Sequence, residues 1–269
     1  MALRATGAAA RPTTPTRTTT TGLLPVSSTR CPAVPPAAPT LPPPPRPPRP
    51  PLVKVCGLTS EADAAAAAGA GADFLGIILW PGAKRSVRPA AAASIAAAGR
   101  AAGARGVVGV FVSEGPDEIV GACAAAGIDT AQLHGPGARA AFPHLPPSLG
   151  VVFVVSVDGG GAPTSPTPAE VCRAAGVPPR TPEWVLVDGA VGGSGESFEW
   201  GGVDPPFDLA SAGWFLAGGL GPGNVEAALA ALQPTGVDVS SGVCGPDGLA
   251  KDGEKVRAFV RAAKGCVVG

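Results

Sequence analysis

The sequence predicts an α/β protein, a single (β/α)8 barrel of the TIM type, preceded by a disordered N-terminal leader. From residue 52 onward, short runs rich in β-branched residues alternate with Ala-rich, helix-prone stretches. Strand candidates begin about 20–30 residues apart with a helical connector between them, which implies parallel strands joined by right-handed crossovers. Eight such units in residues 52–269 match the size of a (β/α)8 barrel.

Residues 1–51 differ in composition from the rest of the chain. They contain six Arg, fifteen Pro and ten Thr but no Asp or Glu, and eight of their last ten positions are Pro. Such a segment has too little apolar surface to form a core. We expect a transit peptide that ends in a stiff Pro-rich spacer, with the chloroplast favoured over the mitochondrion; a plain disordered tail is the alternative. Residues 52–269 are then expected to form the folded barrel domain.

Each unit of the barrel is expected to contribute one strand and then one helix. The segment 198–212 is too rich in Gly and Pro for its helix to be located. A doubly wound open sheet is the alternative fold, but the first strand is followed by CGLTS at 56–60 rather than by the G-x-G-x-x-G of a nucleotide site. The strands are expected at 52–57, 74–79, 107–112, 130–134, 151–157, 183–188, 214–217 and 237–240, and the helices at 60–70, 89–103, 116–126, 137–145, 168–175, 223–232 and 251–264.

Charge and cysteine usage exclude several classes of function. Residues 52–269 carry fourteen basic and twenty acidic residues, and this negative balance disfavours a nucleic-acid surface. The longest uncharged run, 140–157, is interrupted by three prolines, so a membrane span is not expected and the protein is expected to be soluble. The six cysteines show no CxxC spacing, and neither histidine has metal-ligand company, so no metal site or disulfide framework is expected. These cysteines are Cys31, Cys56, Cys123, Cys172, Cys244 and Cys266.

The first predicted strand ends in a lysine and a cysteine that share one face. Side chains alternate along a strand, so Lys54 and Cys56 point to one side while Val53 and Val55 point toward the helices. Cys56 is therefore expected at the barrel mouth. A lone cysteine is more often an inert core residue, but a neighbouring ammonium favours the thiolate.

Two aspartates are expected to point inward from later strands. Asp188 ends the sixth strand on the same face as Leu186, where an acid among hydrophobic residues is costly unless it is paired or functional; capping of the next segment is the alternative. Asp238 should point inward on the eighth strand. Barrel closure makes that strand the neighbour of the first, so the sequence predicts an internal ion pair between Asp238 and Lys54, structural more often than catalytic.

Glycine-rich turns follow the sixth, seventh and eighth strands. Loops in the last two positions commonly bind phosphate through backbone N–H groups, although ordinary βα turns also use glycine. The candidate phosphate-binding residues are Gly193, Gly195, Gly218, Gly219, Ser241 and Gly242.

Two further side chains follow the second and fourth strands. Arg85 suits a planar carboxylate, although a surface basic pair with Lys84 is the commoner explanation for such a residue. His134 is a weaker candidate for an acid or base.

Taken in order, these motifs resemble the phosphoribosylanthranilate isomerase family of tryptophan biosynthesis, over essentially all of residues 52–269. The resemblance rests on the joint order of the motifs. They are KVCGLT at 54–59, RSV at 85–87, VGVFV at 108–112, QLHG at 132–135, LVD at 186–188, GGSG at 192–195, LAGGL at 216–220, NV at 224–225, VDVSSGV at 237–243 and KD at 251–252.

The resemblance implies a metal-free and cofactor-free aldose-ketose isomerase that is a monomer or a homodimer. Its small-molecule substrate would be N-(5-phosphoribosyl)anthranilate, which an Amadori rearrangement converts to 1-(2-carboxyphenylamino)-1-deoxyribulose 5-phosphate. By the same resemblance, Cys56 is the general base, Asp188 is the general acid and Arg85 holds the anthranilate carboxylate. Free Asp titrates near ~3.9 and free Cys near ~8.5, so the site must raise the pKa of the first and lower that of the second. Lys54 is expected to help lower the pKa of Cys56.

The chain departs from the family pattern at three places. Cys244 stands where the family commonly has Glu, Glu196 stands where a Lys commonly follows the glycine loop, and the turn at 80–84 is altered. Both proton-transfer residues are present. The alternatives are another phosphosugar barrel, such as indole-glycerol-phosphate synthase, whose lysine-rich site is missing here, and a barrel that binds anionic metabolites without turnover.

Overall fold

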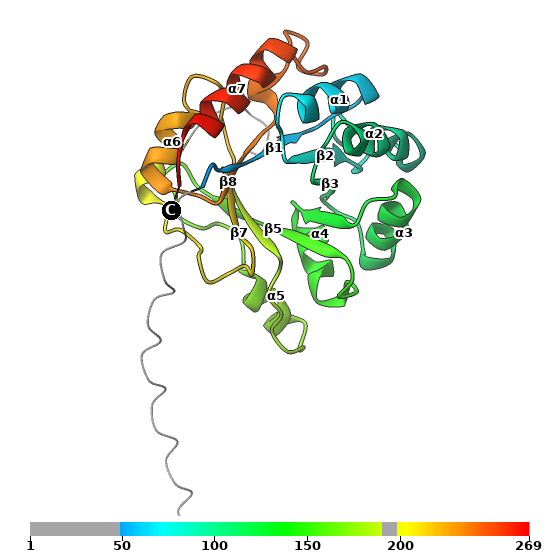
Figure 1. The fold of residues 1–269 in the computed structure, drawn as a ribbon. Coiled ribbons are helices and arrows are strands. Elements are labelled where there is room, and N and C mark those ends of the chain that lie inside the picture. The colour runs from blue at the N-terminus through cyan, green and yellow to red at the C-terminus, as the bar shows by residue number, and fades with distance from the viewer. Residues whose placement is uncertain (1–48, 190–197, 269) are drawn as a thin grey trace, which may run out of the picture. The chain divides into compact units, whose positions relative to one another are not determined.

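The computed structural model describes residues 49–189 and 198–268, and its strands close into a barrel. The eight strands are parallel and lie in the order β1 to β8, with β8 paired to β1. Figure 1 shows this ring of strands with helices on its outside. The predicted (β/α)8 barrel is therefore confirmed. The strands are β1 (Leu52–Cys56), β2 (Phe74–Ile78), β3 (Gly106–Phe111), β4 (Thr130–Leu133), β5 (Gly150–Val157), β6 (Trp184–Gly189), β7 (Gly213–Leu216) and β8 (Gly236–Val239).

Helices begin where the sequence supplies a cap or a proline. The Ser60 hydroxyl accepts a hydrogen bond from the Asp63 N–H, and Asp252 accepts from two N–H groups of the last helix. Proline occupies the first turn of α2, α3, α4 and α5, where its missing N–H costs no hydrogen bond. The helices are α1 (Glu61–Gly69), α2 (Pro89–Ala101), α3 (Pro116–Ala126), α4 (Pro136–Ala141), α5 (Pro168–Ala174), α6 (Val225–Leu232) and α7 (Gly253–Gly265).

Two connections are less helical than an ideal barrel requires. The fourth helix, α4, is short and continues as the 3-10 helix η1 (Phe142–His144), which contains Pro143. In the described residues between β6 and β7, the helical structure is the single 3-10 turn η2 (Trp200–Gly202). This agrees with the Gly- and Pro-rich character that left no helix to predict in 198–212.

The barrel interior is apolar at one end and polar at the other. Phe74, Trp184 and Phe215 form three edge or tilted ring contacts with centroids 5.1–5.9 Å apart, next to Leu186. Such contacts add to the burial of large apolar surface. Val185 and Val187 belong to the other core cluster, together with buried residues of the helices. Strand alternation therefore turns Asp188 to the same side as Leu186, above the aromatic cluster.

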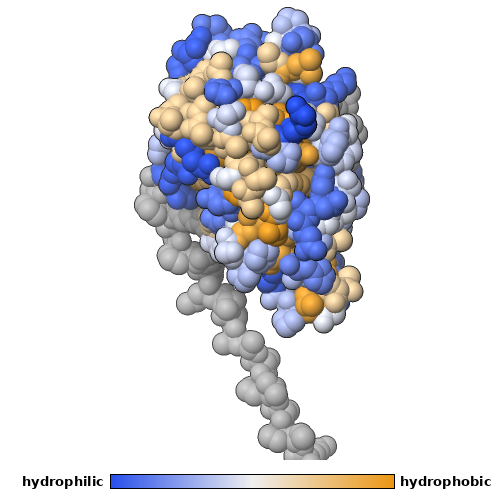
Figure 2. Space-filling model, turned by 90° about the vertical axis from the view of Figure 1, so that its right-hand side faces the viewer, coloured by the Kyte–Doolittle hydropathy of each residue, from blue (hydrophilic) through white to orange (hydrophobic). Residues whose placement is uncertain are grey.

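The outer face that carries α2 and α3 mixes polar and apolar residues, and Val120 of α3 is an exposed large hydrophobic residue. Figure 2 shows the face that carries α2 and α3, on which hydrophilic and moderately apolar residues are mixed. Ala90, Ala91 and Ala97 are among its exposed residues. Within the described part of the chain, no helix has both the length and the apolar character needed to cross a membrane.

Candidate active site

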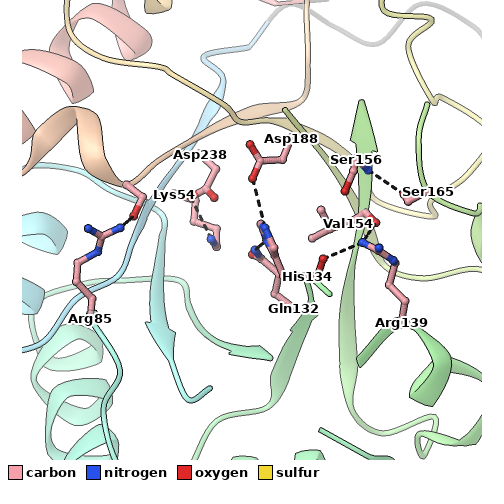
Figure 3. A network of polar contacts seen from close by, with 11 residues as sticks. Lys54, Arg85, Gln132, His134, Arg139, Val154, Ser156, Ser165, Asp188 and Asp238 are labelled. Atoms are coloured by element: carbon pink, nitrogen blue, oxygen red, sulfur yellow. Dashed lines mark hydrogen bonds and ion pairs between the residues drawn. The ribbon is translucent and has the colours of Figure 1, made fainter. Parts of the chain in front are cut away.

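The polar side chains of the barrel interior gather at the carboxyl ends of the strands. Lys54 and Cys56 come from β1, Asp188 from β6 and Asp238 from β8, while His134 directly follows β4. Figure 3 shows Lys54, Asp238, Asp188 and His134 pointing toward one another from separate strands. In (β/α)8 barrels this is the end at which active sites are built.

Lys54 and Asp238 form the predicted internal ion pair. Their Cα positions are partners in the β1–β8 register, and Lys54 Nζ lies 3.0 Å from Asp238 Oδ1. The lysine side chain is 1% exposed and the aspartate 8%. Burial by itself lowers the pKa of Lys54, but attraction by Asp238 and Cys56 outweighs it and leaves the pKa above its ordinary value. The ammonium is therefore held charged inside the barrel.

Cys56 lies at the end of β1 with 6% of its surface exposed. Burial raises the pKa of its thiol, and the charges of Lys54 and Lys251 oppose this only partly. The expectation that Lys54 would bring this pKa below its ordinary value is therefore wrong for the free site. Desolvation of the thiolate in the barrel outweighs both ammonium groups.

Asp188 is an acid that keeps part of its protonated form at neutral pH. Burial raises its pKa to about 7, and the negative charge of Asp238 acts in the same direction. The Gly189 N–H and Lys54 oppose the shift without cancelling it. This direction agrees with what was expected of a general acid. The His134 imidazole lies beside it, with Nε2 3.6 Å from Asp188 Oδ2.

Arg85 is brought next to Cys56 through Ser240. Its Nη2 donates to Ser240 Oγ at 3.0 Å and its Nη1 donates to the Gly248 carbonyl at 2.7 Å. Ser240 Oγ in turn donates to the Cys56 carbonyl at 3.0 Å. A Cβ at Gly57 would lie 2.7 Å from Arg85 Nε, so only glycine leaves room for the guanidinium at this turn. The Nε of Arg85 is buried and has no hydrogen-bond partner in the described residues.

The turns after β7 and β8 pack against each other, and the turn after β7 also packs against Asp188. Gly218 and Gly219 both have positive φ, and a Cβ at Gly218 would lie 3.1 Å from Asp188 Oδ1. A Cβ at Gly242 would meet the Leu220 carbonyl, so the two turns touch through their backbones. Ser241 begins the 3-10 helix η3 (Ser241–Val243). Gly193 and Gly195, like Glu196, lie outside the described residues.

Three polar side chains at the site were not predicted as functional: Gln132 and Arg139 are buried, and Lys251 is half-buried. Lys251 Nζ donates to the Ser240 carbonyl at 2.9 Å and lies 3.5 Å from Cys244 Sγ. Gln132 Nε2 is 3.4 Å from His134 Nδ1, and Arg139 donates to the His134 carbonyl at 2.7 Å. The quoted motifs contain Lys251 and Gln132, but nothing in their spacing indicates these contacts. In the sequence, Arg139 is indistinguishable from an ordinary helix residue, because its contact with His134 forms only when α4 packs against β4.

The described residues of the site do not form a set of metal ligands. In residues 49–189 and 198–268, no group of three or more His, Cys, Asp and Glu side chains is placed to hold a metal ion.

The fold and the site together define the class of protein. A (β/α)8 barrel that brings a protonated buried acid, a buried thiol and two glycine turns to one end of its strands is a barrel enzyme that acts on small molecules at that end. The glycine turns after β7 and β8 occupy the positions where such enzymes commonly bind phosphate.

The family follows from comparison with known proteins. Residues 53–262 match the family described as N-(5'phosphoribosyl)anthranilate (PRA) isomerase, and the chain belongs to this family. N-(5'-phosphoribosyl)anthranilate isomerase 1, chloroplastic, of Arabidopsis thaliana is 44% identical over 213 residues, which are 79% of this chain and 74% of the relative. The isomerase of Chlamydia caviae is 38% identical over 212 residues, 79% of this chain and 96% of the relative.

Solved structures of the family have the same fold. Monomers made from the dimeric phosphoribosylanthranilate isomerase of Thermotoga maritima superimpose with a TM-score of 0.62 at 28% identity, covering 80% of this chain and 100% of that one. A phosphoribosyl anthranilate isomerase in complex with reduced 1-(o-carboxyphenylamino)-1-deoxyribulose 5-phosphate gives a TM-score of 0.60 at 29% identity, with the same coverage.

Proposed function

We propose that this protein is a phosphoribosylanthranilate isomerase whose general acid is Asp188 and whose general base is Cys56. The observation that carries the assignment is that both groups end strands at the same mouth of the barrel, and the Lys54–Asp238 pair acts electrostatically on both. The reaction converts N-(5'-phosphoribosyl)anthranilate to 1-(o-carboxyphenylamino)-1-deoxyribulose 5-phosphate, a step of tryptophan biosynthesis.

The first chemical step opens the sugar. Asp188 gives its proton to the ring oxygen, the bond from that oxygen to C1′ breaks, and the amine lone pair forms the C=N bond of a Schiff base. A carboxyl group whose pKa is about 7 retains the proton that this step requires below pH 7, and a substantial fraction still carries it at pH 7.

The second step moves hydrogen from C2′. The Cys56 thiolate takes the C2′ proton, the C1′–C2′ double bond forms, and the electrons of the C=N bond return to nitrogen. The resulting enolamine then tautomerises to the ketone, with C1′ gaining a proton and the C2′ hydroxyl losing one. Lys54 favours the thiolate during this step, because its ammonium stays charged beside Cys56.

The two ends of the substrate are anions, and the site offers a partner for each. Backbone groups around Gly218, Gly219, Ser241 and Gly242 hold the phosphate, and Gly193 and Gly195 belong to the same proposal. Arg85 holds the anthranilate carboxylate. Its guanidinium is already oriented by Ser240 and Gly248, which are neutral acceptors, so binding a carboxylate adds the charge partner that Arg85 lacks in these two contacts.

Turnover of freshly made phosphoribosylanthranilate, followed by loss of its fluorescence, tests the function. Cys56→Ser should lower kcat by about 10²–10⁴-fold without loss of the fold, because it removes the base. Cys266→Ser, at a half-buried cysteine that follows α7, is the matched control and should keep wild-type turnover. Failure of the wild type to turn over would favour a metabolite-binding barrel, whereas full activity of Cys56→Ser would remove only Cys56 from the mechanism.

The leader is the second part of the proposal. Residues 1–51 act as a transit peptide and Pro-rich spacer for import into the chloroplast, and residues 52–269 form the catalytic domain. Two Arabidopsis thaliana relatives are named as chloroplastic, and the leader has the acid-free composition of a targeting segment. A fusion of residues 1–51 to a fluorescent protein should enter plastids; uniform cytosolic fluorescence would contradict import. Gel filtration of the mature part distinguishes a monomer from a homodimer.

A further inference from the structure

His134 lies against the acid but has no role in the mechanism so far. It directly follows β4, while Asp188 ends β6, and its Nε2 lies 3.6 Å from Asp188 Oδ2. The histidine side chain is 29% exposed and the aspartate 10%, so the imidazole stands on the outer side of the carboxyl group. Figure 3 shows the ring directed at Asp188 with Gln132 behind it.

The contact between His134 and Gln132 favours one tautomer of the imidazole ring. Gln132 Nε2 lies 3.4 Å from His134 Nδ1. With the Gln132 amide in this orientation its nitrogen donates to Nδ1, and a neutral imidazole then carries its hydrogen on Nε2. The Arg139 guanidinium donates to the His134 carbonyl at 2.7 Å and holds the backbone of the same residue. The N–H of the ring is thereby aimed at Asp188.

The His134 imidazole is neutral in the pH range in which Asp188 titrates. Burial, Lys54 and Arg139 together lower the pKa of His134 to about 4. Asp238 on β8 and Lys54 on β1 act electrostatically on Asp188, and His134 lies 3.6 Å from it on the β4 side. Among these, Asp238 resists ionisation of Asp188, and Lys54 is already committed to Asp238. The His134 N–H can donate a hydrogen bond to the Asp188 carboxylate without adding a charge to the site.

We propose that His134 is a positioning residue for Asp188, and that its Nε2–H forms a hydrogen bond to the carboxylate created when Asp188 protonates the sugar. This inference rests on the proposed function of Asp188. At 3.6 Å the contact is longer than a hydrogen bond. Charge on the carboxyl oxygen draws the donor in, so the interaction strengthens as the transition state is approached and favours it over the ground state. His134 keeps its own proton throughout, and the ring oxygen receives the proton of Asp188.

Substitution of His134 tests whether the donor matters. His134→Ala should lower kcat by about 10–100-fold with little change in KM, since a hydrogen bond to a charged group is lost only after substrate is bound. His134→Asn, which retains an N–H donor, should recover part of this loss. The pKa of Asp188, taken from the pH dependence of kcat/KM, should rise in His134→Ala, because a donor that favours the ionised form is removed. His144→Ala, at the exposed histidine of η1, is the control.

Nitrogen NMR provides a test that does not depend on turnover. The chain has two histidines, so His144→Ala leaves a single imidazole to observe. The expected result is a neutral ring with hydrogen on Nε2 that does not titrate near 6.5 and protonates only near pH 4. Hydrogen on Nδ1, or protonation near 6.5, would overturn the inference. So would equal kcat in wild type, His134→Ala and His134→Asn. An inactive wild type would instead remove the proposed function, while the NMR result would still report the state of the ring.

Discussion

The two sides of the barrel mouth hold their ionisable groups in different ways. On β1 and β8, Lys54 and Asp238 make a 3.0 Å ion pair that is almost completely buried. On the β4 and β6 side, His134 and Asp188 lie 3.6 Å apart, with pKa values of about 4 and about 7. The Lys54–Asp238 pair is a direct ion pair shielded from water, whereas a pKa of about 7 leaves Asp188 close to gaining or losing a proton. We therefore expect the Lys54–Asp238 side to maintain the electrostatic field and the Asp188 side to exchange protons.

Removing the acidic proton of Asp188, on the β4 and β6 side, should have the largest effect on turnover. Asp188→Asn keeps the shape of the carboxyl group but cannot give a proton, so kcat should fall by about 10²–10⁴-fold. Steady-state loss of substrate fluorescence measures the change. Asp117→Asn, at an exposed position in the first turn of α3, should behave as wild type. Unchanged kcat in Asp188→Asn would reject the division between the two sides.

Breaking the closed pair should affect stability more than any other change on the first side. Lys54→Met leaves Asp238 buried without a partner and should lower the free energy of unfolding by about 3–5 kcal/mol. Adding Asp238→Leu to the same chain should restore much of that loss, because no uncompensated charge then remains. Denaturant unfolding measures both. A single variant as stable as wild type would show that the pair does not hold a fixed charge in the core.

Substitution of Arg85 tests whether the substrate carboxylate binds on the β1 and β8 side, to which Arg85 is joined through Ser240. Arg85→Gln removes the charge that is proposed to meet the anthranilate carboxylate, so KM should rise by about 10–100-fold while kcat changes less. Arg88→Gln, at the exposed cap of α2, is the matched control. A large fall in kcat with unchanged KM would place Arg85 in the chemical step instead.

The dependence of kcat/KM on pH tests the order of the pKa values of Asp188 and Cys56. The productive form needs Asp188 protonated and Cys56 ionised, yet the pKa of Asp188 is about 7 and burial raises that of Cys56 above its ordinary value. As pH rises toward 7, more thiolate forms while the acid keeps its proton, so kcat/KM should rise about tenfold per unit. It should then level off and fall once the pH exceeds the pKa of Cys56. A rate independent of pH between 5 and 8 would contradict this order.

Local pattern predicted a large part of the fold. Each predicted strand lies within one or two residues of an observed one, because apolar β-branched runs and the glycines that follow them are local signals. Barrel closure also predicted that Lys54 and Asp238 are neighbours, because it places β8 next to β1. The contact between His134 and Asp188 escaped prediction, since β4 and β6 are not adjacent strands and their side chains meet only across the mouth.

The sequence alone determined which residues alternate inward, where helices begin, and which family motifs occur in order along the chain. The tertiary structure decided the protonation states. Lys54 lies two residues from Cys56, and this nearness suggested a lowered thiol pKa. In the barrel, however, burial outweighs the lysine charge and the pKa of Cys56 rises. The physical reason is that desolvation depends on everything packed around a group, whereas sequence spacing reports only its neighbours along one strand.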